Sequence, residues 1–392
     1  MRGIPVNPAL SMNRESSGEK GGVKILIAAG GSGGHIFPAV ALARRLKQLD
    51  GGVQILFVGS EKALDRRIFE KEGLRYSLLS ANKMPYRIGP ASLLFLIKLF
   101  ADLVRSLCIL AFDRPNVVLG FGGYVSWPIV FTAYLLRIPR IVHEQNVIPG
   151  RSNKVLFNLA DKIALSFSET ARSLSVRDSK KAVLTGNPIR ASLFKGDRPN
   201  GIMRLGLDEK RFTLLVIGGS QGSHFLNETV IDAVSRLDTK MKARLQVIHI
   251  TGLKDYDWAA KEYERIGIPS RVFSFIDRIE DAYSASNLIV TRSGASAIFE
   301  IALFGRPMIL IPYPFAGSHQ AENAKVFSER GAAVKMEEKD LSADSLMEEF
   351  IGLIGDRPRL EKMADGARRL GVPEASDNLA KLVLGSRNNV KE

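Results

Sequence analysis

The stretch that decides the fold is Thr291-Arg292-Ser293-Gly294-Ala295-Ser296-Ala297-Ile298-Phe299-Glu300, which follows an apolar strand predicted over residues 287–290. Its small residues leave free backbone N–H groups at the start of a helix that we expect to end near residue 304, and such groups suit a phosphate. Glu300 lies about two turns into that helix, where a carboxylate can accept hydrogen bonds from a ribose. Taken alone, the stretch is explained equally well by an ordinary strand-to-helix turn with Ser293 as N-cap.

Two further glycine-rich turns between a strand and a helix favour the phosphate. Gly30-Gly31-Ser32-Gly33-Gly34-His35 follows an apolar run over residues 23–28 and precedes a helix predicted over residues 36–49. Gly218-Gly219-Ser220-Gln221-Gly222 repeats the arrangement, with Asn227 on the helix that follows.

The first of these turns is not a complete dinucleotide fingerprint. Ile36 stands where the third glycine would be, so a nicotinamide-dependent enzyme is disfavoured. The amides of Ser32, Gly33 and Gly34 still suit a pyrophosphate. His35 suits a base or a phosphate-binding group, the alternative being a structural histidine.

Strands alternate with helices in two blocks of the chain. In the first block, apolar runs predict strands over residues 23–28, 54–58, 116–119, 140–142 and 162–165. In the second block, they predict strands over residues 212–217, 245–250, 271–273, 288–290 and 308–311. This repetition predicts an α/β protein with two Rossmann-like, doubly wound parallel-sheet domains joined near residues 187–190.

The domain boundaries follow from the same alternation. Residues 1–22, rich in Gly, Ser, Asn and Pro, lack an apolar core and are expected to form a disordered extension, not a secretory signal. The two domains are then expected over residues 23–188 and 189–371. We expect residues 372–392 to form a C-terminal helix that packs back on the first domain.

The composition narrows the class of partner. With 45% hydrophobic and 24% charged residues, this chain of 392 residues is typical of soluble globular proteins. Its one cysteine, Cys108, excludes an internal disulfide and fits a reducing compartment. The net charge of +14 favours an anionic partner, and the lack of a nucleic-acid-binding motif favours lipid and phosphate over nucleic acid.

Residues 91–111 form a long apolar run with two possible interpretations. Lys98, Asp102 and Arg105 interrupt it at spacings that place all three on one helical face, which disfavours a membrane-spanning helix. The first interpretation is a core helix whose charged stripe faces solvent. The second is an amphipathic surface helix that enters a membrane, next to the basic stretch at residues 83–87.

Polar side chains follow several other predicted strands. The three groups are Gly120-Phe121-Gly122-Gly123-Tyr124-Val125-Ser126, His143-Glu144-Gln145-Asn146 and Gly317-Ser318-His319-Gln320-Ala321-Glu322-Asn323-Ala324. The first two follow strands at the carboxyl edge, where open α/β sheets collect their ligands. Capping and turn chemistry alone would require fewer hydrogen-bonding side chains.

Seven motifs in this order resemble the MurG family, the peptidoglycan N-acetylglucosaminyltransferases of glycosyltransferase family 28. The motifs lie at residues 30–35, 120–126, 143–146, 186–190, 218–222, 292–300 and 319–324. The resemblance covers the chain from about Val23 to its last helices. It implies a GT-B fold, in which two Rossmann-like domains face each other across a cleft that holds the active site.

The resemblance also implies the reaction and its site in the second domain. The donor would be UDP-N-acetylglucosamine, and the acceptor would be lipid I, undecaprenyl-pyrophosphoryl-MurNAc-pentapeptide, whose 4-hydroxyl attacks with inversion to form lipid II. Donor-binding residues implied in the second domain are Arg190, Ser220, Asn227, Ile276, Arg292, Ala295, Ser296, Ala297, Ile298, Phe299, Glu300 and Gln320. Asn146 of the first domain would contact the donor as well.

In the first domain, the resemblance implies acceptor-binding and catalytic residues. Binding residues are Ser32, Gly33, Gly34 and Asn153, and the catalytic set is His35, Tyr124, His143 and Glu144. His35 is the first choice for the base that takes the proton of the attacking hydroxyl, and Glu144 is the second. The family works at the cytoplasmic face of the bacterial membrane, as a peripheral protein beside other cell-wall synthesis proteins.

We predict no cofactor and no obligatory metal. Asp255-Tyr256-Asp257 has the spacing of a metal-binding motif, but an acidic pair at a helix start explains it better. Two competing functions stay open. One is a different GT-B enzyme, such as a diacylglycerol glycosyltransferase or a UDP-sugar epimerase. The other is a catalytically silent UDP-sugar-binding protein at the membrane.

Overall fold

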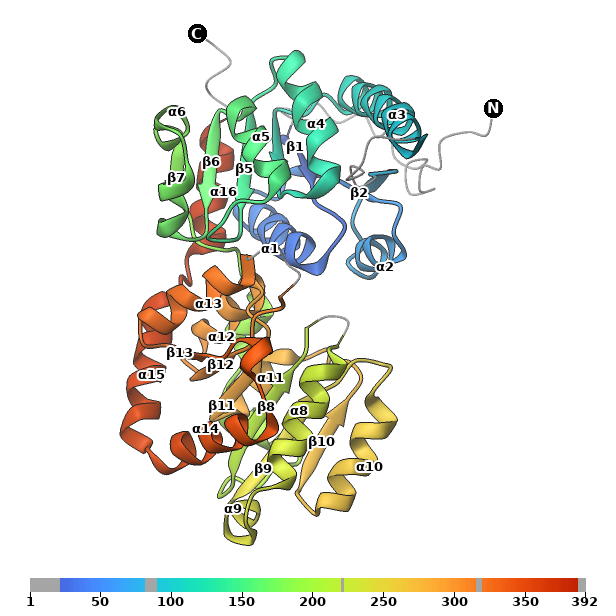
Figure 1. Ribbon diagram of the computed structural model, residues 1–392. Coiled ribbons are helices and arrows are strands. Elements are labelled where there is room, and N and C mark those ends of the chain that lie inside the picture. The colour runs from blue at the N-terminus through green and yellow to red at the C-terminus, as the bar shows by residue number, and fades with distance from the viewer. Residues whose placement is uncertain (1–21, 82–89, 220–221, 315–318, 387–392) are drawn as a thin grey trace. The chain divides into compact units, whose positions relative to one another are not determined.

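The computed structural model describes residues 22–81, 90–219, 222–314 and 319–386 (Figure 1). The chain forms two units. The first unit contains Met1–Pro188 and Glu374–Glu392, and the second contains Ile189–Pro373. Several sequence predictions lie outside the described residues: the extension up to residue 21, the basic stretch at 83–87, Ser220, Gln221, Gly317 and Ser318.

The first unit is built on a parallel sheet of seven strands in the order β3-β2-β1-β4-β5-β6-β7. Its strands are β1 (Lys24–Ala28), β2 (Gln54–Ser60), β3 (Tyr76–Leu79), β4 (Val117–Gly120), β5 (Arg140–Glu144), β6 (Lys162–Leu165) and β7 (Ala182–Leu184). Its helices are α1 (Gly33–Leu49), α2 (Ala63–Lys71), α3 (Pro90–Asp113), α4 (Gly123–Leu135), α5 (Arg151–Leu159), α6 (Val176–Ser179) and α16 (Ala375–Gly385), with a 3-10 turn at Ser168–Ser173.

Alternate residues of β1 supply the two faces of this sheet. Ile25 and Ile27 belong to a buried cluster with α1 and α16, whereas Leu26 and Ala28 belong to a second cluster with α4 and α5. A strand buried on both faces has a continuous apolar sequence, as Lys24–Ala28 does after its first residue.

The last helix of the chain, α16, completes the first unit. Its Leu379 and Val383 lie in the cluster that α1 covers. Polar contacts also hold it: Arg45 Nε donates to Asp377 at 2.6 Å, and Asn378 Nδ2 donates to the carbonyl of Thr185 at 3.3 Å. The first unit is therefore discontinuous in sequence.

The second unit has a parallel sheet of six strands in the order β10-β9-β8-β11-β12-β13. Its strands are β8 (Phe212–Ile217), β9 (Leu245–Ile250), β10 (Ser270–Phe273), β11 (Leu288–Thr291), β12 (Met308–Leu310) and β13 (Ala333–Lys335). Its helices are α7 (Arg198–Leu205), α8 (His224–Ser235), α9 (Thr239–Arg244), α10 (Tyr256–Ile266), α11 (Ile279–Ala285), α12 (Ala295–Leu303), α13 (His319–Glu329), α14 (Ala343–Gly355) and α15 (Arg357–Leu370), with 3-10 turns at Ala191–Lys195 and Glu338–Asp340.

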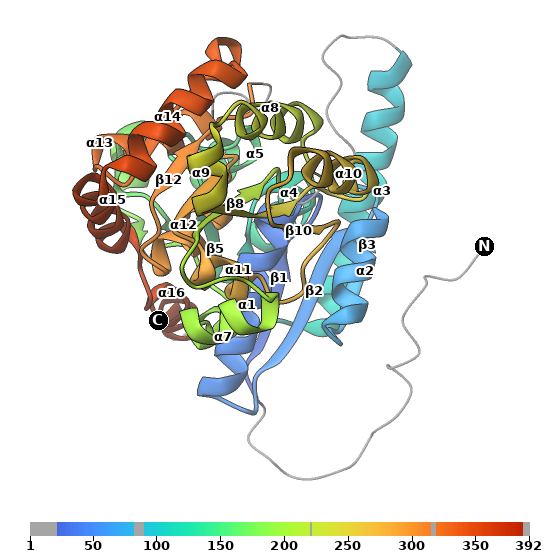
Figure 2. The ribbon, with the colours of Figure 1, turned by 90° about the horizontal axis from the view of Figure 1, so that it is seen from below.

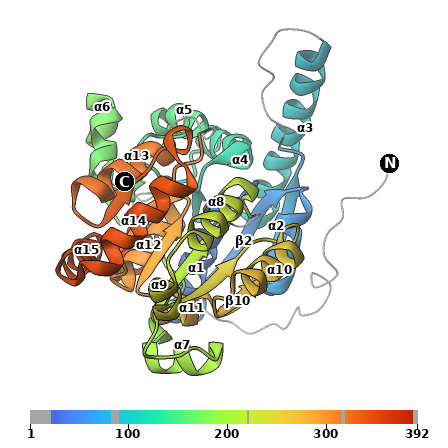
Figure 3. The same ribbon diagram turned by 60° about the horizontal axis from the view of Figure 1, so that its bottom comes forward.

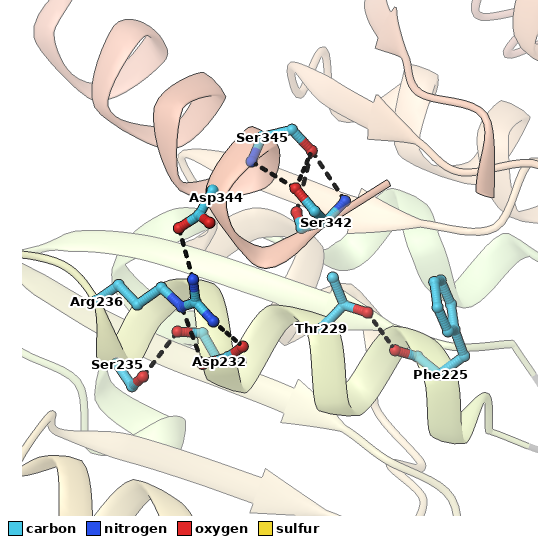
Figure 4. A network of polar contacts seen from close by, with 8 residues as sticks. All are labelled: Phe225, Thr229, Asp232, Ser235, Arg236, Ser342, Asp344 and Ser345. Carbon is cyan, nitrogen blue, oxygen red and sulfur yellow. Dashed lines mark hydrogen bonds and ion pairs between the residues drawn. The ribbon is translucent and has the colours of Figure 1, made fainter. Parts of the chain in front are cut away.

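Helix α14 packs on α8 in the second unit, and a polar network ties the two helices at their surface (Figure 4). The guanidinium of Arg236 contacts Asp232, one turn back on α8, at 2.7 Å and Asp344 at the start of α14 at 2.6 Å. Ser342 and Ser345 form a capping box at the same end of α14. These contacts are exposed, so they fix the helix start and add little free energy.

The predicted fold class, two Rossmann-like parallel-sheet domains, is confirmed. Three strands that the sequence did not predict are β3, β7 and β13. All three lie at an edge of their sheet, and their residues are mostly half-buried or exposed. An edge strand lacks a neighbour on one side, so its sequence does not need the continuous apolar run that identifies a central strand.

Helix α3 differs from the first interpretation of its sequence. Asp102, expected to face solvent, is buried and accepts hydrogen bonds from Ser80 N, Ser80 Oγ and Ala81 N at 3.0, 2.8 and 3.0 Å. The apolar side chains face outward instead, with exposed fractions of 45–69%. They are Leu93, Leu94, Leu96, Ile97, Phe100, Val104 and Leu107. The first interpretation, in which the charged stripe faces solvent, is therefore wrong for Asp102.

The start of α3 also stands away from its sheet. Figures 2 and 3 show this end of the helix extending beyond the other elements of the first unit. No helix among the described residues is long and apolar enough to cross a membrane.

Candidate functional site

The first candidate site lies at the carboxyl ends of β1, β4 and β5, which are neighbours in the first sheet. Because the strands are parallel, the loops that follow them emerge at one edge. These loops carry the first glycine turn with His35, the glycines at 120–123, and Glu144 with the residues after it. Strand order therefore brings together motifs that are far apart in the sequence.

His35 is the group in this site that is best suited to accept a proton. Its Nδ1 lies 3.2 Å from the carbonyl oxygen of Gly30 and 3.3 Å from Oγ of Ser32. Because a carbonyl can only accept, Nδ1 carries the proton and Nε2 keeps its lone pair. Burial lowers the pKa of His35 below its ordinary 6.5, although the Gly30 carbonyl acts in the opposite direction. The ring is thus neutral near pH 7 and basic at Nε2.

Gly122 and Gly123 bring the main chain against this imidazole. A Cβ at Gly122 would lie 3.5 Å from Nε2 of His35 and 3.3 Å from the amide of Asn153. Both glycines have positive φ, +92° and +74°, which L-residues rarely adopt. The next residue, Tyr124, is 46% exposed in the first turn of α4.

Glu144 holds the loop that follows β5. Its Oε1 accepts from N and Nδ2 of Asn146 at 3.0 and 3.2 Å. Its Oε2 accepts from N of Gly150 at 3.1 Å and from Nδ2 of Asn153 at 2.8 Å. Four donors occupy most of the lone pairs of this carboxylate, so Glu144 is less available than His35 to take a proton.

His143 is buried next to this site with both ring nitrogens engaged. Nε2 donates to the carbonyl of Gly186 at 3.2 Å, and Nδ1 accepts from Nε2 of Gln145 at 3.0 Å. Burial lowers the pKa of His143 to about 4, which keeps the ring neutral. These contacts connect the end of β5 to the chain after β7.

Asp65 is a buried residue at this edge that the sequence did not single out. It lies on α2, and its carboxylate accepts hydrogen bonds from Gly31 and Ser60. Its only sequence signal is an acidic residue in a helix predicted over Lys62–Glu72, which carries several charges. Such a residue ordinarily faces solvent, so the contact with the glycine turn was not predictable.

The second candidate site lies at the carboxyl ends of β8, β11 and β12 in the second unit, again three neighbouring strands. Glu300, on α12, is buried there. Its Oε1 pairs with the guanidinium of Arg190 at 3.2 Å, and its Oε2 accepts from Tyr283 Oη at 3.2 Å. Burial raises the pKa of Glu300, while Arg190 and Tyr283 lower it. Tyr283 is a further residue that the sequence did not predict.

The start of α12 differs from the alternative in which Ser293 caps it. Gly294 is the N-cap, and the Ser293 hydroxyl instead donates to the carbonyl of Gln320 at 2.8 Å. The Gln320 side chain accepts from the amide of Tyr313 at 3.0 Å, and Asn323 donates to the carbonyl of Ser293 at 3.2 Å. The first turn, Ala295, Ser296 and Ala297, thus lies beside α13, while Ile298 and Phe299 are buried.

Arg292 is buried, and its guanidinium links several segments of the second unit. Its guanidinium donates to the Ser223 hydroxyl at 2.7 Å, forms an ion pair with Glu338 and lies 5.5 Å from the ring centroid of Tyr313. It also reaches the carbonyl of Ile311 at 3.3 Å. These contacts join the ends of β11 and β12 to the start of α8.

Asn227 and Asp255 belong to one network, which includes the carbonyl of Thr251 beside Gly222. Asn227 Nδ2 donates to Asp255 Oδ2 at 2.7 Å and to the carbonyl of Thr251 at 2.9 Å, and its Oδ1 lies 3.0 Å from His249 Nε2. Asp255 Oδ1 lies 3.0 Å from His224 Nδ1. The Asp255 carboxylate is therefore engaged by side chains of the protein, those of Asn227 and His224. No cluster of three metal-ligating side chains occurs among the described residues.

The structure therefore brings most of the expected residues to two separate edges, one in each unit. Ile276 lies half-buried in the loop after β10, at the far side of the second sheet from β12. Ser220 lies outside the described residues.

Two family models match this chain. The glycosyltransferase family 28 N-terminal domain matches residues 25–165, and the glycosyltransferase family 28 C-terminal domain matches residues 213–379.

Curated relatives extend over nearly the whole length. The chain is 36% identical over 368 residues to a protein of Halothermothrix orenii, covering 92% of this chain and 98% of that one. It is 40% identical over 357 residues to a protein of Syntrophus aciditrophicus, covering 91% and 96%. Both are named UDP-N-acetylglucosamine--N-acetylmuramyl-(pentapeptide) pyrophosphoryl-undecaprenol N-acetylglucosamine transferase.

Solved structures share the fold. The Acinetobacter baumannii MurG crystal structure matches with a TM-score of 0.73 and 25% identity, covering 93% of this chain and 99% of that one. A UDP-GlcNAc 2-epimerase from Neisseria meningitidis matches with a TM-score of 0.67 at 13% identity, covering 93% and 100%. The second match shows the fold alone and does not distinguish transfer from epimerisation.

Proposed function

The chain belongs to glycosyltransferase family 28, and from this premise we propose that it transfers N-acetylglucosamine from UDP-N-acetylglucosamine to lipid I. The acceptor hydroxyl would be O4 of MurNAc in undecaprenyl-pyrophosphoryl-MurNAc-pentapeptide, and the product would be lipid II. The observation that carries the proposal is the 36% identity to a transferase of this name across 98% of its length.

The reaction is a direct displacement at the donor sugar. O4 of the acceptor forms a bond to C1, the bond from C1 to the β-phosphate oxygen breaks, and UDP leaves with the electron pair. Attack from the opposite face inverts C1, so an α-linked donor gives a β-linked product. The hydroxyl proton passes to Nε2 of His35, which is unprotonated because Nδ1 donates to Gly30.

The two units divide the substrates between them. The first unit, with the amides of Ser32, Gly33 and Gly34, would bind the acceptor pyrophosphate, and Asn153 and Tyr124 would lie near its sugar. The second unit would bind the donor, with Glu300 on the ribose and the first turn of α12 on the diphosphate. Arg190, which pairs with Glu300 at 3.2 Å, supplies a positive charge for the departing UDP.

A membrane-bound acceptor requires the enzyme to reach the bilayer surface. We propose that it does so through the exposed apolar side chains of α3, at the cytoplasmic face of the bacterial membrane. Leu93, Leu94, Leu96, Ile97 and Phe100 are each more than half exposed. Such a row on one helix suits insertion into the headgroup region, and the net charge of +14 favours anionic lipid.

A transfer assay tests this function. Labelled UDP-N-acetylglucosamine is incubated with a lipid I analogue, with diacylglycerol or with no acceptor, and the products are separated. We expect a disaccharide product with the lipid I analogue alone. Transfer to diacylglycerol would indicate a different GT-B transferase, and conversion of the sugar nucleotide without acceptor would indicate an epimerase. Binding of UDP-N-acetylglucosamine with no turnover would indicate a silent binding protein.

A further inference from the structure

The first turn of α2 lies against the first glycine turn, and two of its charged residues contact that turn. β1 and β2 are parallel neighbours, paired from Lys24 with Gln54 to Ala28 with Val58. The loops that follow them therefore emerge side by side. Lys62, at the end of the loop after β2, and Asp65, in the first turn of α2, both reach the glycine turn that follows β1.

Asp65 shapes that glycine turn. Its side chain is fully buried, and its Oδ2 accepts from Gly31 N at 2.8 Å, Ser60 N at 2.8 Å and Ser60 Oγ at 2.6 Å. A Cβ at Gly30 would lie 2.5 Å from the same oxygen, so only glycine fits there. Gly31 has a φ of +83°, which is also a glycine conformation. The conformation of the turn is therefore fixed by its contacts with a buried carboxylate.

This carboxylate disfavours the binding of an anion at the turn in two ways. It occupies the Gly31 amide, which is then not available to a phosphate, and it places a negative charge directly behind the turn. A pyrophosphate on the remaining amides would be repelled unless a cation lies close by. Lys62 supplies that cation. Its Nζ donates to the carbonyl of Gly31 at 3.1 Å, and an ammonium has two further N–H groups to donate.

We propose that Lys62 binds the pyrophosphate of the lipid acceptor, and that Asp65 is the positioning residue that fixes the glycine turn for it. The inference rests on the proposed function, because it assigns residues to the acceptor half of that reaction. It adds a cation from the loop after β2 to amides from the loop after β1.

The test compares Lys62→Met with Arg67→Met, a charge-removing control at an exposed position of the same helix. Losing a charge-assisted contact should raise the acceptor KM about tenfold or more. The donor KM should stay unchanged, and Lys62→Arg should restore most of the loss. The effect should shrink with an acceptor analogue that carries one phosphate in place of two. Equal acceptor KM values for Lys62→Met and Arg67→Met would overturn the role of Lys62.

A binding measurement separates this inference from the proposed function. Farnesyl pyrophosphate is titrated calorimetrically into the wild type and both variants. Binding should weaken about tenfold in Lys62→Met alone, whether or not the wild type turns over lipid I. Unchanged affinity overturns the inference. An inactive wild type with the expected binding difference overturns only the proposed function.

Asp65 is tested by Asp65→Asn and by the milder Ser60→Ala, which removes one of its hydrogen bonds. A positioning role predicts a higher acceptor KM at an unchanged donor KM in both variants. A purely structural role would lower the amount of folded enzyme, and with it the apparent kcat, at constant acceptor KM. Thermal unfolding measured beside the kinetics identifies that result, which would overturn the positioning role.

Discussion

The two units place different chemistry on the same scaffold. Both have a parallel sheet with a glycine turn leading into a helix, and both collect polar side chains at the carboxyl edge. In the first unit the central group is the imidazole of His35, held in one tautomer by the carbonyl of Gly30. In the second unit it is the ion pair of Glu300 with Arg190.

Burial explains why the two edges differ. Removing an imidazole from water favours its neutral form, so burial lowers the pKa of His35 and leaves a base near pH 7. Removing a carboxylate from water also favours the neutral form, and the guanidinium of Arg190 opposes that effect at Glu300. The first edge is thus suited to moving a proton, and the second to holding polar hydroxyls and phosphates.

The largest expected effect comes from removing the proposed proton acceptor of the first unit. His35→Ala and His35→Gln should both lower kcat at least about a hundredfold, with little change in the KM for UDP-N-acetylglucosamine. In the wild type, the acidic limb of the kcat/KM profile should lie below pH 6.5, because burial lowers the pKa of His35 from that value. Both variants should lose this limb. A near-normal kcat with a raised acceptor KM would instead assign His35 to phosphate binding.

The matching change in the second unit should affect binding. Glu300→Ala should weaken UDP binding by roughly 1.5–3 kcal/mol, about ten- to 150-fold, because the role proposed for Glu300 is that of a charged hydrogen-bond partner of the ribose. Glu300→Gln keeps the shape of the side chain and shows the effect of removing its charge alone. Glu329→Ala, at an exposed position paired with Lys325, is the control. Unchanged UDP affinity by calorimetry in Glu300→Ala would contradict the role given to Glu300.

Both units should lose stability in acid through buried histidines, His143 together with His35 in the first unit and His249 in the second. Burial lowers the pKa of His143 to about 4 and that of His249 to about 3, from an ordinary 6.5. Below pH 6.5 the unfolded chain binds a proton that the folded chain does not, so stability present above pH 6.5 is lost as the pH falls toward these values. The loss should be about 1.4 kcal/mol per pH unit for each histidine.

Tryptophan fluorescence can follow the units separately, because Trp127 lies in the first and Trp258 in the second. In Trp258→Phe the remaining signal reports the first unit, and adding His143→Gln should reduce its pH dependence, with His35 contributing the remainder. The reverse pair, Trp127→Phe with His249→Gln, serves the second unit. An unchanged slope in either case would rule out that histidine as the cause.

The smallest effect on the chemistry is expected at α3, which distinguishes the first unit by its row of exposed apolar residues. Replacing Leu93, Leu94 and Leu96 with serine should reduce sedimentation with anionic liposomes while leaving thermal unfolding unchanged. Leu253→Ser, at an 85% exposed position of the second unit, should alter neither property. A collapse of thermal stability in the α3 variant would show that these side chains pack in a core.

The central strands were predictable because burial on both faces requires a continuous apolar run, and β6, β8 and β9 have the expected bounds. The edge strands β3, β7 and β13 were not, because an edge strand does not need such a run, although the edge strand β10 was predicted over residues 271–273. The orientation of α3 was also hidden. Periodicity places Asp102 on a face but does not reveal that Ser80 and Ala81 supply its partners.

Prediction of the two candidate sites from the sequence was limited in the same way. Glycine turns and polar loops identified the stretches, but the partners of each side chain depend on sheet order. Glu144 and His143 have similar signals in sequence, yet one accepts four hydrogen bonds and the other connects two segments of backbone. Asp65 and Tyr283 had no distinctive signal, since the contact of Asp65 with Gly31 spans 34 residues of the chain and that of Tyr283 with Glu300 spans 17.

The discontinuity of the first unit has a consequence for synthesis of the chain. Leu379, Ala380 and Val383 of α16 complete a cluster begun by β1 and α1. A ribosome makes residues 189–373 before it makes that helix, so the second unit is finished while the first still exposes part of its core. Chaperones would bind the incompletely covered surface of α1. Translation that ends before residue 375 would yield a chain without α16, which proteases would degrade.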